Sequence, residues 1–554
     1  MMTNQLAIAL AQINPSVGDI EANTALITKM FRKGNALGAD LIVTGELSVS
    51  GYPPEDLVLK SYFLDQVEIA VNKLAEETKK LKSGLLIGAP WRVNSKLYNA
   101  AILLDNGRIA DVRRKHKLPN YGVFDEARIF SPSDVPGPIH FRDVLLGVMI
   151  CEDMWSLEVS ECLAETGAEL FIVLNGSPFE VNKADFRLNH AIARITETNK
   201  PIVYVNLVGG QDELVFDGGS FVIGSDYKLR ACLPSFSEEL LITHWEQEPS
   251  GWVCQNGPKA PTLSEPAKIY SALALGLKDY VKKNAFPGVV IGLSGGVDSA
   301  LTAAIAVDAL GSKNVRAVMM PSPFTSPDSI LDAAETANSL NIHLDQINIH
   351  PAMKTFESLL TPLFVGQSTD VTEENIQART RALLLMAISN KFGYMLLTTG
   401  NKSEMSVGFS TLYGDMCGGF SVLKDVYKTT VFELCHWRNT NQIVNGLGPT
   451  GQLIPKNIIT KPPSAELAAN QKDEDSLPPY SKLDHILRSL IEEEKSLHEI
   501  INNGFNEQMV RKVWKMLDRA EYKRRQAPPG VKISVCAFGR DRRYPITNGF
   551  TGQL

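Results

Sequence analysis

One stretch near the middle of the chain, residues 288–300, constrains the fold more than any other. A β-branched run over 289–291 ends at a glycine, a turn of small residues follows, and an apolar, alanine-rich stretch comes next. This order predicts a buried strand, a tight loop and a helix. Gly295 and Gly296 carry no Cβ, so their N–H groups can approach an anion at the positive end of the helix. The stretch therefore predicts a phosphate-binding loop.

This loop lacks the lysine that precedes the final Ser or Thr of a P-loop. Its Ser-Gly-Gly-Val-Asp-Ser sequence instead resembles the signature of the ATP pyrophosphatases, which cleave ATP to AMP and pyrophosphate. Asp298 predicts Mg²⁺ as a cofactor, because a carboxylate repels a triphosphate unless a divalent cation lies between them. The alternative interpretation is a tight strand-to-helix connection without a ligand. The resemblance implies that ATP contacts the loop residues, which are Ser294, Gly295, Gly296, Val297, Asp298 and Ser299.

The length and composition limit the class of protein. With 554 residues the chain is too long for one hydrophobic core, and roughly two to four domains are expected. The net charge of −7 is spread along the chain without a basic tract, which argues against nucleic acid or a membrane surface as a partner. No apolar stretch approaches the ~20 residues that span a bilayer, and no secretion signal is recognisable, so a cytoplasmic location is expected. Seven cysteines without CxxC spacing predict free thiols.

In the first half of the chain, polar residues stand where strands are predicted to end. Glu46 follows a predicted strand over 41–44, and Cys151 follows the apolar run 146–150, directly before an expected helix. The carboxyl ends of strands are the usual location of site residues in α/β layers. A helix N-terminus and nearby cations can lower a thiol pKa from about 8.5 to roughly 3.5–7.5, which makes the reactive thiolate available at neutral pH. Taken alone, such a cysteine is more often a buried structural thiol.

Glu46, Lys115 and Cys151, each in its local sequence, resemble the Glu-Lys-Cys triad of the nitrilase superfamily, whose members hydrolyse amides on an αββα sandwich. The resemblance implies that Cys151 attacks the amide carbonyl, that Glu46 acts as general base and then acid, and that Lys115 stabilises the oxyanion. Lys117 is the competitor for the lysine's role, but the family spacing Lys-x-x-Leu, matched by Lys115 and Leu118, favours Lys115. Residues 1–245 are thus expected to form a nitrilase-like glutaminase domain.

Further residues of this half are candidates for binding glutamine. Glu126 resembles a second, supporting glutamate of the superfamily, and the alternative is a solvated surface carboxylate. Tyr52 and Tyr121 are candidates for lining the pocket, with simple packing as the alternative. The segment 175–179 follows a predicted strand and is placed to bind the amino-acid end of the substrate. The predicted glutamine-binding set is Tyr52, Tyr121, Glu126, Ser177 and Lys183.

The second half of the chain predicts a different α/β domain. The segment 246–266 collects Pro, Gly, Ser and Asn and loses its periodicity, which predicts an interdomain linker. Strand and helix patterns alternate over 267–554, which favours a parallel, doubly wound sheet with its ligand at the carboxyl ends of the strands. The expected fold class is α/β, with an N-terminal αββα nitrilase-like sandwich and a C-terminal doubly wound ATP pyrophosphatase domain.

Several motifs of the second half resemble the glutamine-dependent NAD synthetases, and this resemblance covers nearly the whole chain. These motifs begin at Asn375, Gly400, Tyr413, Lys461 and Asp475. By position, Glu404 resembles a second Mg²⁺ ligand beside Asp298, and Lys428 resembles a lysine that meets the ATP phosphates. Surface ion pairs are the alternative. The resemblance implies ATP contacts at Thr399 and Lys428, and contacts to deamido-NAD at Asn375, Arg379 and Glu404.

The resemblances together imply a ligase of NAD biosynthesis. The first domain would release ammonia from glutamine, and the second would amidate deamido-NAD through an acyl adenylate while ATP becomes AMP and pyrophosphate. A dry passage between the sites is expected, because ammonium is no nucleophile and an acyl adenylate hydrolyses in water. The family resemblance also implies a homodimer or higher homo-oligomer. The alternatives are another glutamine-fed ATP-pyrophosphatase amidotransferase and a non-catalytic protein that binds glutamine or adenylate.

Overall fold

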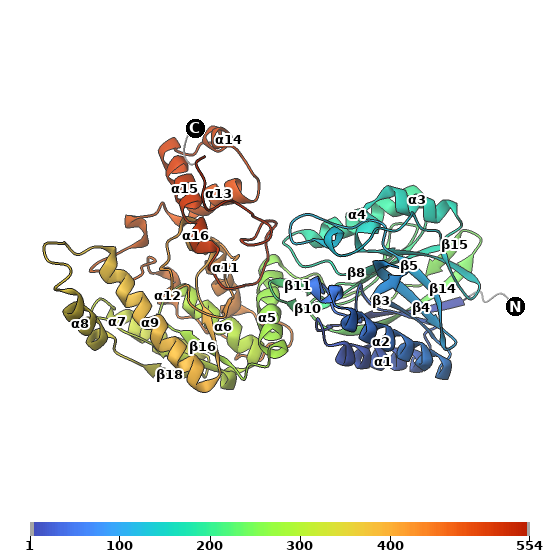
Figure 1. The fold of residues 1–554 in the computed structure, drawn as a ribbon, viewed down its shortest axis with the longest axis horizontal. Coiled ribbons are helices and arrows are strands. Elements are labelled where there is room, and N and C mark those ends of the chain that lie inside the picture. Colours follow the sequence, from blue (N-terminus) through green and yellow to red (C-terminus); the bar gives the residue numbers. More distant parts are fainter. Residues whose placement is uncertain (1–4, 551–554) are drawn as a thin grey trace. The chain divides into compact units, whose positions relative to one another are not determined.

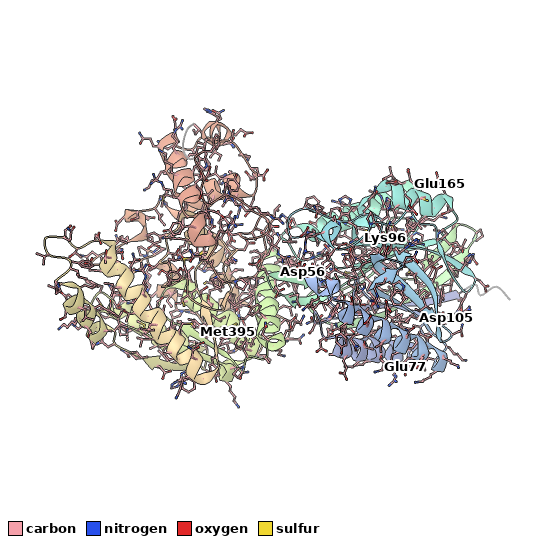
Figure 2. All side chains as sticks on the ribbon, viewed as in Figure 1. Asp56, Glu77, Lys96, Asp105, Glu165 and Met395 are labelled. Carbon is pink, nitrogen blue, oxygen red and sulfur yellow. The ribbon has the colours of Figure 1, made fainter. Side chains whose placement is uncertain are left out.

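The computed structural model describes residues 5–550, and the chain divides into two compact units, Met1–Leu263 and Ser264–Leu554 (Figure 1). Figure 2 shows the side chains on the ribbon and labels Lys96, Glu165 and Met395. Lys96 and Glu165 are exposed, and Met395 is buried. Among the described residues, no helix is both long enough and apolar enough to cross a membrane.

The first unit contains two large sheets. One has seven strands in the order β15-β14-β1-β2-β3-β4-β5, and the other has six strands in the order β13-β12-β9-β8-β7-β6. The first sheet consists of β1 (Gln5–Gln12), β2 (Leu41–Val43), β3 (Gly84–Val93), β4 (Lys96–Asp105), β5 (Arg108–Arg114), β14 (Glu239–Glu248) and β15 (Gly251–Cys254). The second consists of β6 (Ile139–Phe141), β7 (Val144–Ile150), β8 (Leu170–Asn175), β9 (Ile202–Asn206), β12 (Phe221–Ile223) and β13 (Leu229–Cys232). A separate antiparallel pair is formed by β10 (Val208–Gln211) and β11 (Leu214–Asp217).

The alternation of side chains along β1 explains how the layers form. Leu6, Ile8 and Leu10 point into the core between the two sheets, whereas Ala9 and Ala11 point into a second core beneath two helices. Two further helices pack on the outer face of the second sheet, and a third hydrophobic core lies between these helices and the sheet. This is the predicted αββα sandwich. The covering helices are α1 (Ile20–Ala36), α2 (Ser61–Lys80), α3 (Leu157–Glu165) and α4 (Lys183–Thr198).

Parallel strands bring polar residues to one edge of each sheet. β1, β2 and β3 run parallel, as do β7, β8 and β9. Glu46 follows β2, and Cys151 follows β7. The backbone at Glu46 lies so close to Gly88 of β3 that a Cβ on this glycine would be 2.3 Å from the nitrogen of Leu47. The absence of a side chain at Gly88 therefore fixes how deeply Glu46 enters the sandwich.

The first sheet continues past the boundary expected at residue 245. β14 pairs with β1 and ends at Glu248, and β15 pairs with β14. Trp252 and Cys254 are buried in the core between the two sheets. The predicted linker is therefore wrong for residues 246–254, because a short edge hairpin carries too few apolar residues to show a clear period.

The second unit is built on one sheet of five parallel strands in the order β18-β17-β16-β19-β20. The chain order reverses at β16, so right-handed crossovers place α6 and α9 on opposite faces of the sheet. This is the predicted doubly wound arrangement. The strands are β16 (Val289–Gly292), β17 (Val315–Met319), β18 (His343–Gln346), β19 (Met395–Thr398) and β20 (Phe420–Ser421). The helices are α5 (Glu265–Lys283), α6 (Val297–Leu310), α7 (Pro327–Ser339), α8 (His350–Leu360), α9 (Val371–Phe392), α10 (Lys402–Val407), α11 (Lys428–Thr440) and α12 (Lys456–Thr460).

The last part of the chain is helical and has a core of its own. Leu483, Leu487, Val510 and Leu517 pack there against Met405 of α10, together with other apolar residues. The C-terminal helices therefore support the segment that carries Glu404. They are α13 (Tyr480–Ile491), α14 (Leu497–Asn502), α15 (Glu507–Arg519) and α16 (Glu521–Arg524).

Candidate active sites

The first candidate site is a buried charge cluster in the first unit. Lys115 directly follows β5, and its Nζ donates to Oε1 of Glu46 at 2.7 Å and to both carboxylate oxygens of Glu126 at 2.9 Å. Lys115 and Glu46 are 0% exposed. Burial opposes the charge of the lysine, but Glu126 and Glu46 together hold the pKa of Lys115 well above its ordinary value. The three groups therefore form one ionised unit inside the sandwich.

Glu46 keeps one carboxylate oxygen unoccupied. Its Oε1 accepts from Lys115 and from Nδ2 of Asn99 at 2.8 Å. Its Oε2 is buried and has no hydrogen-bond partner in the part of the chain that the structure describes. A buried acceptor without a partner is placed to take a proton. Asn99 is absent from the predicted site, although an amide in the apolar strand β4 is an unusual residue that could have pointed to it.

Cys151 is the first residue of a short 3₁₀ helix, Cys151–Trp155, that begins where β7 ends. Its φ of 45° lies in the left-handed region, so the backbone turns sharply at the thiol. Asp153 secures this turn. Its carboxylate accepts the N–H of Ile150 at 3.2 Å, and it also accepts the N–H groups of His116 at 3.0 Å and Lys117 at 2.8 Å. The hydrogen bonds of Asp153 thereby connect the turn that carries the thiol to the segment that contains Lys115.

The environment of the thiol differs from the one expected from the sequence. Cys151 is 4% exposed, and burial raises its pKa well above the ordinary value. The charge of Glu46 acts in the same direction, and Lys115 opposes it. Burial, which the local sequence does not show, and the carboxylate of Glu46 therefore act against the lowered thiol pKa that the elbow was expected to give. The raised pKa of Cys151 favours the protonated thiol, and the neighbouring carboxylate of Glu46 has one oxygen without a hydrogen-bond partner among the described residues.

The two candidate lysines lie in different environments. Lys115 is buried between the two glutamates, whereas the side chain of Lys117 is 37% exposed and forms an ion pair of 2.6 Å with Glu158. The structure therefore places Lys115, and not Lys117, with the predicted base.

Two of the predicted glutamine-binding residues belong to the same cluster. The hydroxyl of Tyr52 donates to Oε1 of Glu126 at 2.9 Å. Glu126 is 4% exposed, so it is not a solvated surface carboxylate, and burial raises its pKa. A small cavity reaches these two residues between Phe124, Phe130 and other apolar side chains.

The other three predicted residues are placed around the cluster. Ser177 is buried, and its Oγ accepts from Nε of Arg187 at 3.2 Å. Tyr121 is 55% exposed and donates to Glu152 at 3.0 Å. Lys183 lies over the ring of Phe124, 5.8 Å from its centroid. Within residues 5–550, neither Ser177 nor Tyr121 forms a hydrogen bond to Glu46 or Glu126.

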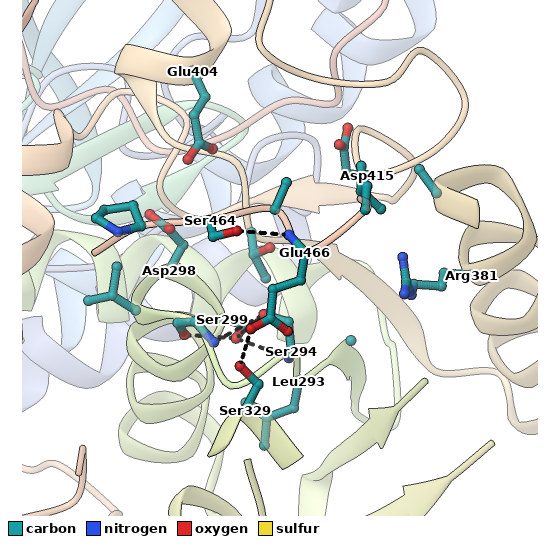
Figure 3. A pocket seen from close by; sticks show the side chains of 18 of the residues that line it. Leu293, Ser294, Asp298, Ser299, Ser329, Arg381, Glu404, Asp415, Ser464 and Glu466 are labelled. Atoms are coloured by element: carbon teal, nitrogen blue, oxygen red, sulfur yellow. Dashed lines mark hydrogen bonds between the residues drawn. The ribbon is translucent and has the colours of Figure 1, made fainter. Parts of the chain in front are cut away.

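The second candidate site is a cavity of about 320 Å³ at the carboxyl ends of β16, β17 and β19 (Figure 3). Its floor is the predicted phosphate loop. The N–H of Ser294 donates to Oγ of Ser299 at 3.2 Å, and the N–H of Gly296 donates to Oγ of Ser294 at 3.2 Å. Gly295 has a φ of 79°, and a Cβ there would lie 2.2 Å from the carbonyl oxygen of Ser329. Only glycine fits this position, so the loop can pack against the start of α7.

A lysine between two carboxylates stands above the loop. Lys428, the first residue of α11, donates to Oδ2 of Asp298 at 2.5 Å and to Oε1 of Glu404 at 3.0 Å. Asn401 donates to the other oxygen of Asp298 at 2.8 Å. Burial raises the pKa of Glu404 to about 7, although Lys428 opposes this shift. Lys428 is buried, and the side chains of Asp298 and Glu404 are only 16% and 18% exposed, which argues against an ion pair on the open surface.

The remaining predicted nucleotide contacts fall into two groups, those that line the cavity and those that do not. Val297 and Thr399 line the cavity, but Asn375 and Arg379 are not among its lining residues. Asn375 accepts from the hydroxyl of Thr411 at 2.9 Å, and Nε of Arg379 donates to the carbonyl of Leu412 at 3.2 Å.

Sequence reasoning missed two features of this cavity. Arg381 lines it, and burial lowers the pKa of this arginine to about 10. The segment 461–467 also lines it, and the carboxylate of Glu466 accepts from the hydroxyl of Ser329 at 2.8 Å (Figure 3). It also accepts from the hydroxyl of Ser326 at 2.8 Å. Both residues lie in motifs that the sequence analysis noted without assigning them a contact.

The chain matches two known families. Residues 7–248 match the carbon-nitrogen hydrolases, and residues 269–527 match NAD synthase. The chain is 45% identical to the glutamine-dependent NAD(+) synthetase of Rhodobacter capsulatus, with 100% of each chain covered. It is 42% identical to that of Thermotoga maritima, with 99% of this chain and 100% of the other covered. The chain belongs to the glutamine-dependent NAD(+) synthetases.

Solved structures of glutamine-dependent NAD(+) synthetases have the same architecture. The structure from Acinetobacter baumannii in complex with adenosine diphosphate gives a TM-score of 0.79 at 42% identity, and the match covers 99% of this chain and 100% of that chain. The structure from Cytophaga hutchinsonii gives a TM-score of 0.82 at 21% identity over 98% of each chain, which shows the shared fold. Membership of the glutamine-dependent NAD(+) synthetases excludes the alternatives of another amidotransferase and of a non-catalytic binding protein.

Replacement of the two candidate lysines should affect stability very differently. Lys115→Met leaves Glu46 and Glu126 buried without a counter-charge, and we expect a loss of about 3–5 kcal/mol in the free energy of unfolding of the first unit. Lys117→Met removes an exposed pair, and the expected loss is at most about 1 kcal/mol. Urea unfolding of both variants measures the difference, and equal losses would contradict the assignment of Lys115 to the cluster.

Proposed function

We propose that this chain makes NAD from deamido-NAD, with glutamine as nitrogen donor and ATP as co-substrate. The observation that carries the proposal is the buried cluster of Glu46, Lys115 and Glu126 tied to the Cys151 turn, because it is arranged for amide hydrolysis. The phosphate loop with its cavity, in the same chain, supplies the site that uses the nitrogen. The adenosine diphosphate in the A. baumannii structure supports an adenine nucleotide as the ligand.

In the first half-reaction Cys151 attacks the side-chain amide of glutamine. The free Oε2 of Glu46 takes the thiol proton, so the nucleophile forms only when the base acts. Lys115 stabilises the oxyanion of the tetrahedral intermediate. Glu46 then gives its proton to the departing nitrogen, and ammonia leaves a γ-glutamyl thioester. Water, activated by the same carboxylate, hydrolyses the thioester to glutamate.

In the second half-reaction the nicotinate carboxylate of deamido-NAD attacks the α-phosphorus of ATP. Adenylation is needed because a free carboxylate is a poor electrophile. The loop at Gly296 and the ammonium of Lys428 bind the phosphates that leave as pyrophosphate. Ammonia then attacks the acyl adenylate carbonyl, and AMP departs as NAD forms.

Mg²⁺ is part of the proposal. No group of three or more His, Cys, Asp or Glu side chains that could hold a metal occurs within residues 5–550. Asp298 and Glu404 nevertheless converge on one positive charge, that of Lys428, and carboxylate oxygens are the ligands that Mg²⁺ prefers. These two residues would hold the ion together with phosphate oxygens. When bound, it supplies charge neutralisation on the phosphates.

The other predicted binding residues stay in the proposal as ligand contacts. Tyr52 and Ser177 lie beside the charge cluster, and Tyr121 and Lys183 lie around the acidic side chain of Glu152, where a charged substrate end can be recognised. Asn375 and Arg379 are proposed contacts to deamido-NAD, outside the lining of the ATP cavity.

We also propose that the protein is a cytoplasmic homo-oligomer. Several apolar side chains on α8, α9 and their connection are exposed, and exposed apolar residues gathered in one segment of the chain are common at interfaces. They are Leu359 (66% exposed), Leu363 (75%), Val365 (80%) and Val371 (60%). The cytoplasmic location is supported by cysteines that are all free thiols, because a reducing compartment keeps them so.

Loss of the thiol should separate the two half-reactions. We expect Cys151→Ala to abolish NAD formation with glutamine and to leave NAD formation with ammonia unchanged, because the nitrogen then bypasses the first site. Cys162→Ala, which removes a half-buried thiol of α3, is the matched control and should retain both activities. NAD is measured by liquid chromatography. Loss of both activities in Cys151→Ala, or of neither, would refute the two-site scheme.

Loss of a carboxylate above the phosphate loop should affect both nitrogen sources. We expect Asp298→Asn to lower NAD formation with glutamine and with ammonia by about 100-fold or more, because charge on the leaving phosphates is no longer balanced. Asp328→Asn changes an exposed acid of α7 and serves as the control. Unchanged turnover with ammonia in Asp298→Asn would contradict the assignment.

Charges on the apolar surface should disrupt the oligomer. Light scattering of the wild-type protein should give at least twice the monomer mass, and the double change Leu359→Lys and Leu363→Lys should reduce that mass. Leu37→Lys alters an exposed leucine of the first unit and should leave the mass unchanged. A monomeric wild-type protein at micromolar concentration would exclude this interface.

A further inference from the structure

The C-terminal helical part contains a buried acid that the mechanism above does not use. Asp484 lies on α13 and is 3% exposed, and it is not among the residues that line the ATP cavity. We propose that Asp484 is a positioning residue, which holds Lys428 and Glu404 in the arrangement that adenylation requires. The inference rests on the proposed function and adds a residue to it.

One oxygen of Asp484 acts on the start of α11. Its Oδ2 accepts the N–H of Thr429 at 2.8 Å. The residue that precedes α11, Tyr427, offers no side-chain cap to the helix. An unpaired N–H at a buried helix start is unfavourable, and a carboxylate there is stabilised by the helix dipole. Asp484 therefore replaces the missing cap, and Lys428 is the neighbouring residue in this first turn.

The other oxygen of Asp484 forms a hydrogen bond with α10 and, through Ser403, is connected to α11 as well. Oδ1 of Asp484 accepts from the hydroxyl of Ser403 at 2.5 Å, and Oγ of Ser403 in turn accepts the N–H of Lys428 at 2.9 Å. Ser403 directly precedes Glu404 in the chain. A single carboxylate thus connects the first turn of α11, which carries Lys428, with Ser403, the chain neighbour of Glu404. Lys428 and Glu404 form an ion pair of 3.0 Å.

The packing around Asp484 indicates that its role goes beyond stability. Leu483 and Leu487 on the same helix already bury α13 against α10 and α11. A buried carboxylate adds little net stability over an apolar residue of the same size, because it must lose its hydration. The carboxylate instead fixes the relative orientation of the first turns of α10 and α11. Hydrogen bonds are directional, whereas apolar contacts allow the two helices to rotate against each other. Arg488, one turn further along α13, is a cation that acts on this carboxylate.

The test uses the full-length protein and Asp484→Asn, which keeps the shape of the side chain. The amide nitrogen cannot accept a hydrogen bond, so the side chain can no longer accept from both Ser403 and Thr429. We expect kcat for ammonia-supported NAD formation to fall by about 10- to 100-fold, as when a partner that orients a ligand is removed. The KM for deamido-NAD should stay close to the wild-type value. Basal glutamine hydrolysis at Cys151, measured without ATP, should be unchanged and reports that the chain is folded.

A second pair of variants covers the case in which Asp484→Asn does not fold. Ser403→Ala removes the hydroxyl that links α10 to α11 and should lower kcat in the same way. Ser489→Ala is the matched control, because this buried serine lies on α13 and donates to Glu493 at 3.0 Å, away from the site. The control should retain wild-type kcat. Thermal melting of all variants measures any general loss of stability.

The outcomes separate a positioning role from a structural one. A fall in kcat for Asp484→Asn and Ser403→Ala, with basal glutamine hydrolysis and melting temperature retained, supports the proposal. Unchanged kcat in both variants, or an equal fall in synthesis and glutamine hydrolysis, overturns it. If the wild-type protein forms no NAD, the proposed function fails, and ATP binding measured by calorimetry then decides. Weaker ATP binding by Asp484→Asn and Ser403→Ala than by the wild-type protein supports the positioning of Lys428 by Asp484. ATP binding equal to that of the wild-type protein overturns the proposal.

Discussion

In each unit the site is centred on a lysine ammonium held between two carboxylates. Lys115 lies between Glu46 and Glu126, and Lys428 lies between Asp298 and Glu404. Such charges are stable inside a protein only when partners replace their hydration. The partners come from segments that are distant in the chain, so the ion pairs are complete only when the layers have packed correctly. The remaining features of each site, from the free oxygen of Glu46 to the bound carboxylate of Asp298, follow from this arrangement.

The two clusters differ in what they make possible. In the first unit Lys115 donates to one carboxylate oxygen of Glu46. The second oxygen of Glu46 has no hydrogen-bond partner among the described residues. In the second unit the lysine occupies the space between two acids above a phosphate loop. There the positive charge can be shared with an incoming triphosphate, because phosphate oxygens offer the same kind of contact as carboxylates.

Much of the architecture could be predicted from local patterns. The strand alternation at β1, the strand, loop and helix around Gly295, and the polar residues after β2 and β7 are encoded within a few residues of each other, and the structure contains them all. The contacts that complete the sites were not predictable in this way. Asn99, Asp153 and Asp484 each form a hydrogen bond with a residue at least 27 positions away in the sequence. The hydrogen bonds of Asn99 to Glu126 and to Glu46 are examples. The direction of the pKa shift of Cys151 failed for the same reason, since burial is a property of the fold.

The neutral state of the buried thiol also protects the protein. Peroxides and other oxidants react with thiolates far faster than with protonated thiols, and sulfinic and sulfonic acids form irreversibly once oxidation proceeds. Cys151 is 4% exposed and burial raises its pKa, so both access to the sulfur and formation of the reactive thiolate are limited in the fold. The turn after β7 thus places the thiol where the surrounding fold slows its oxidation.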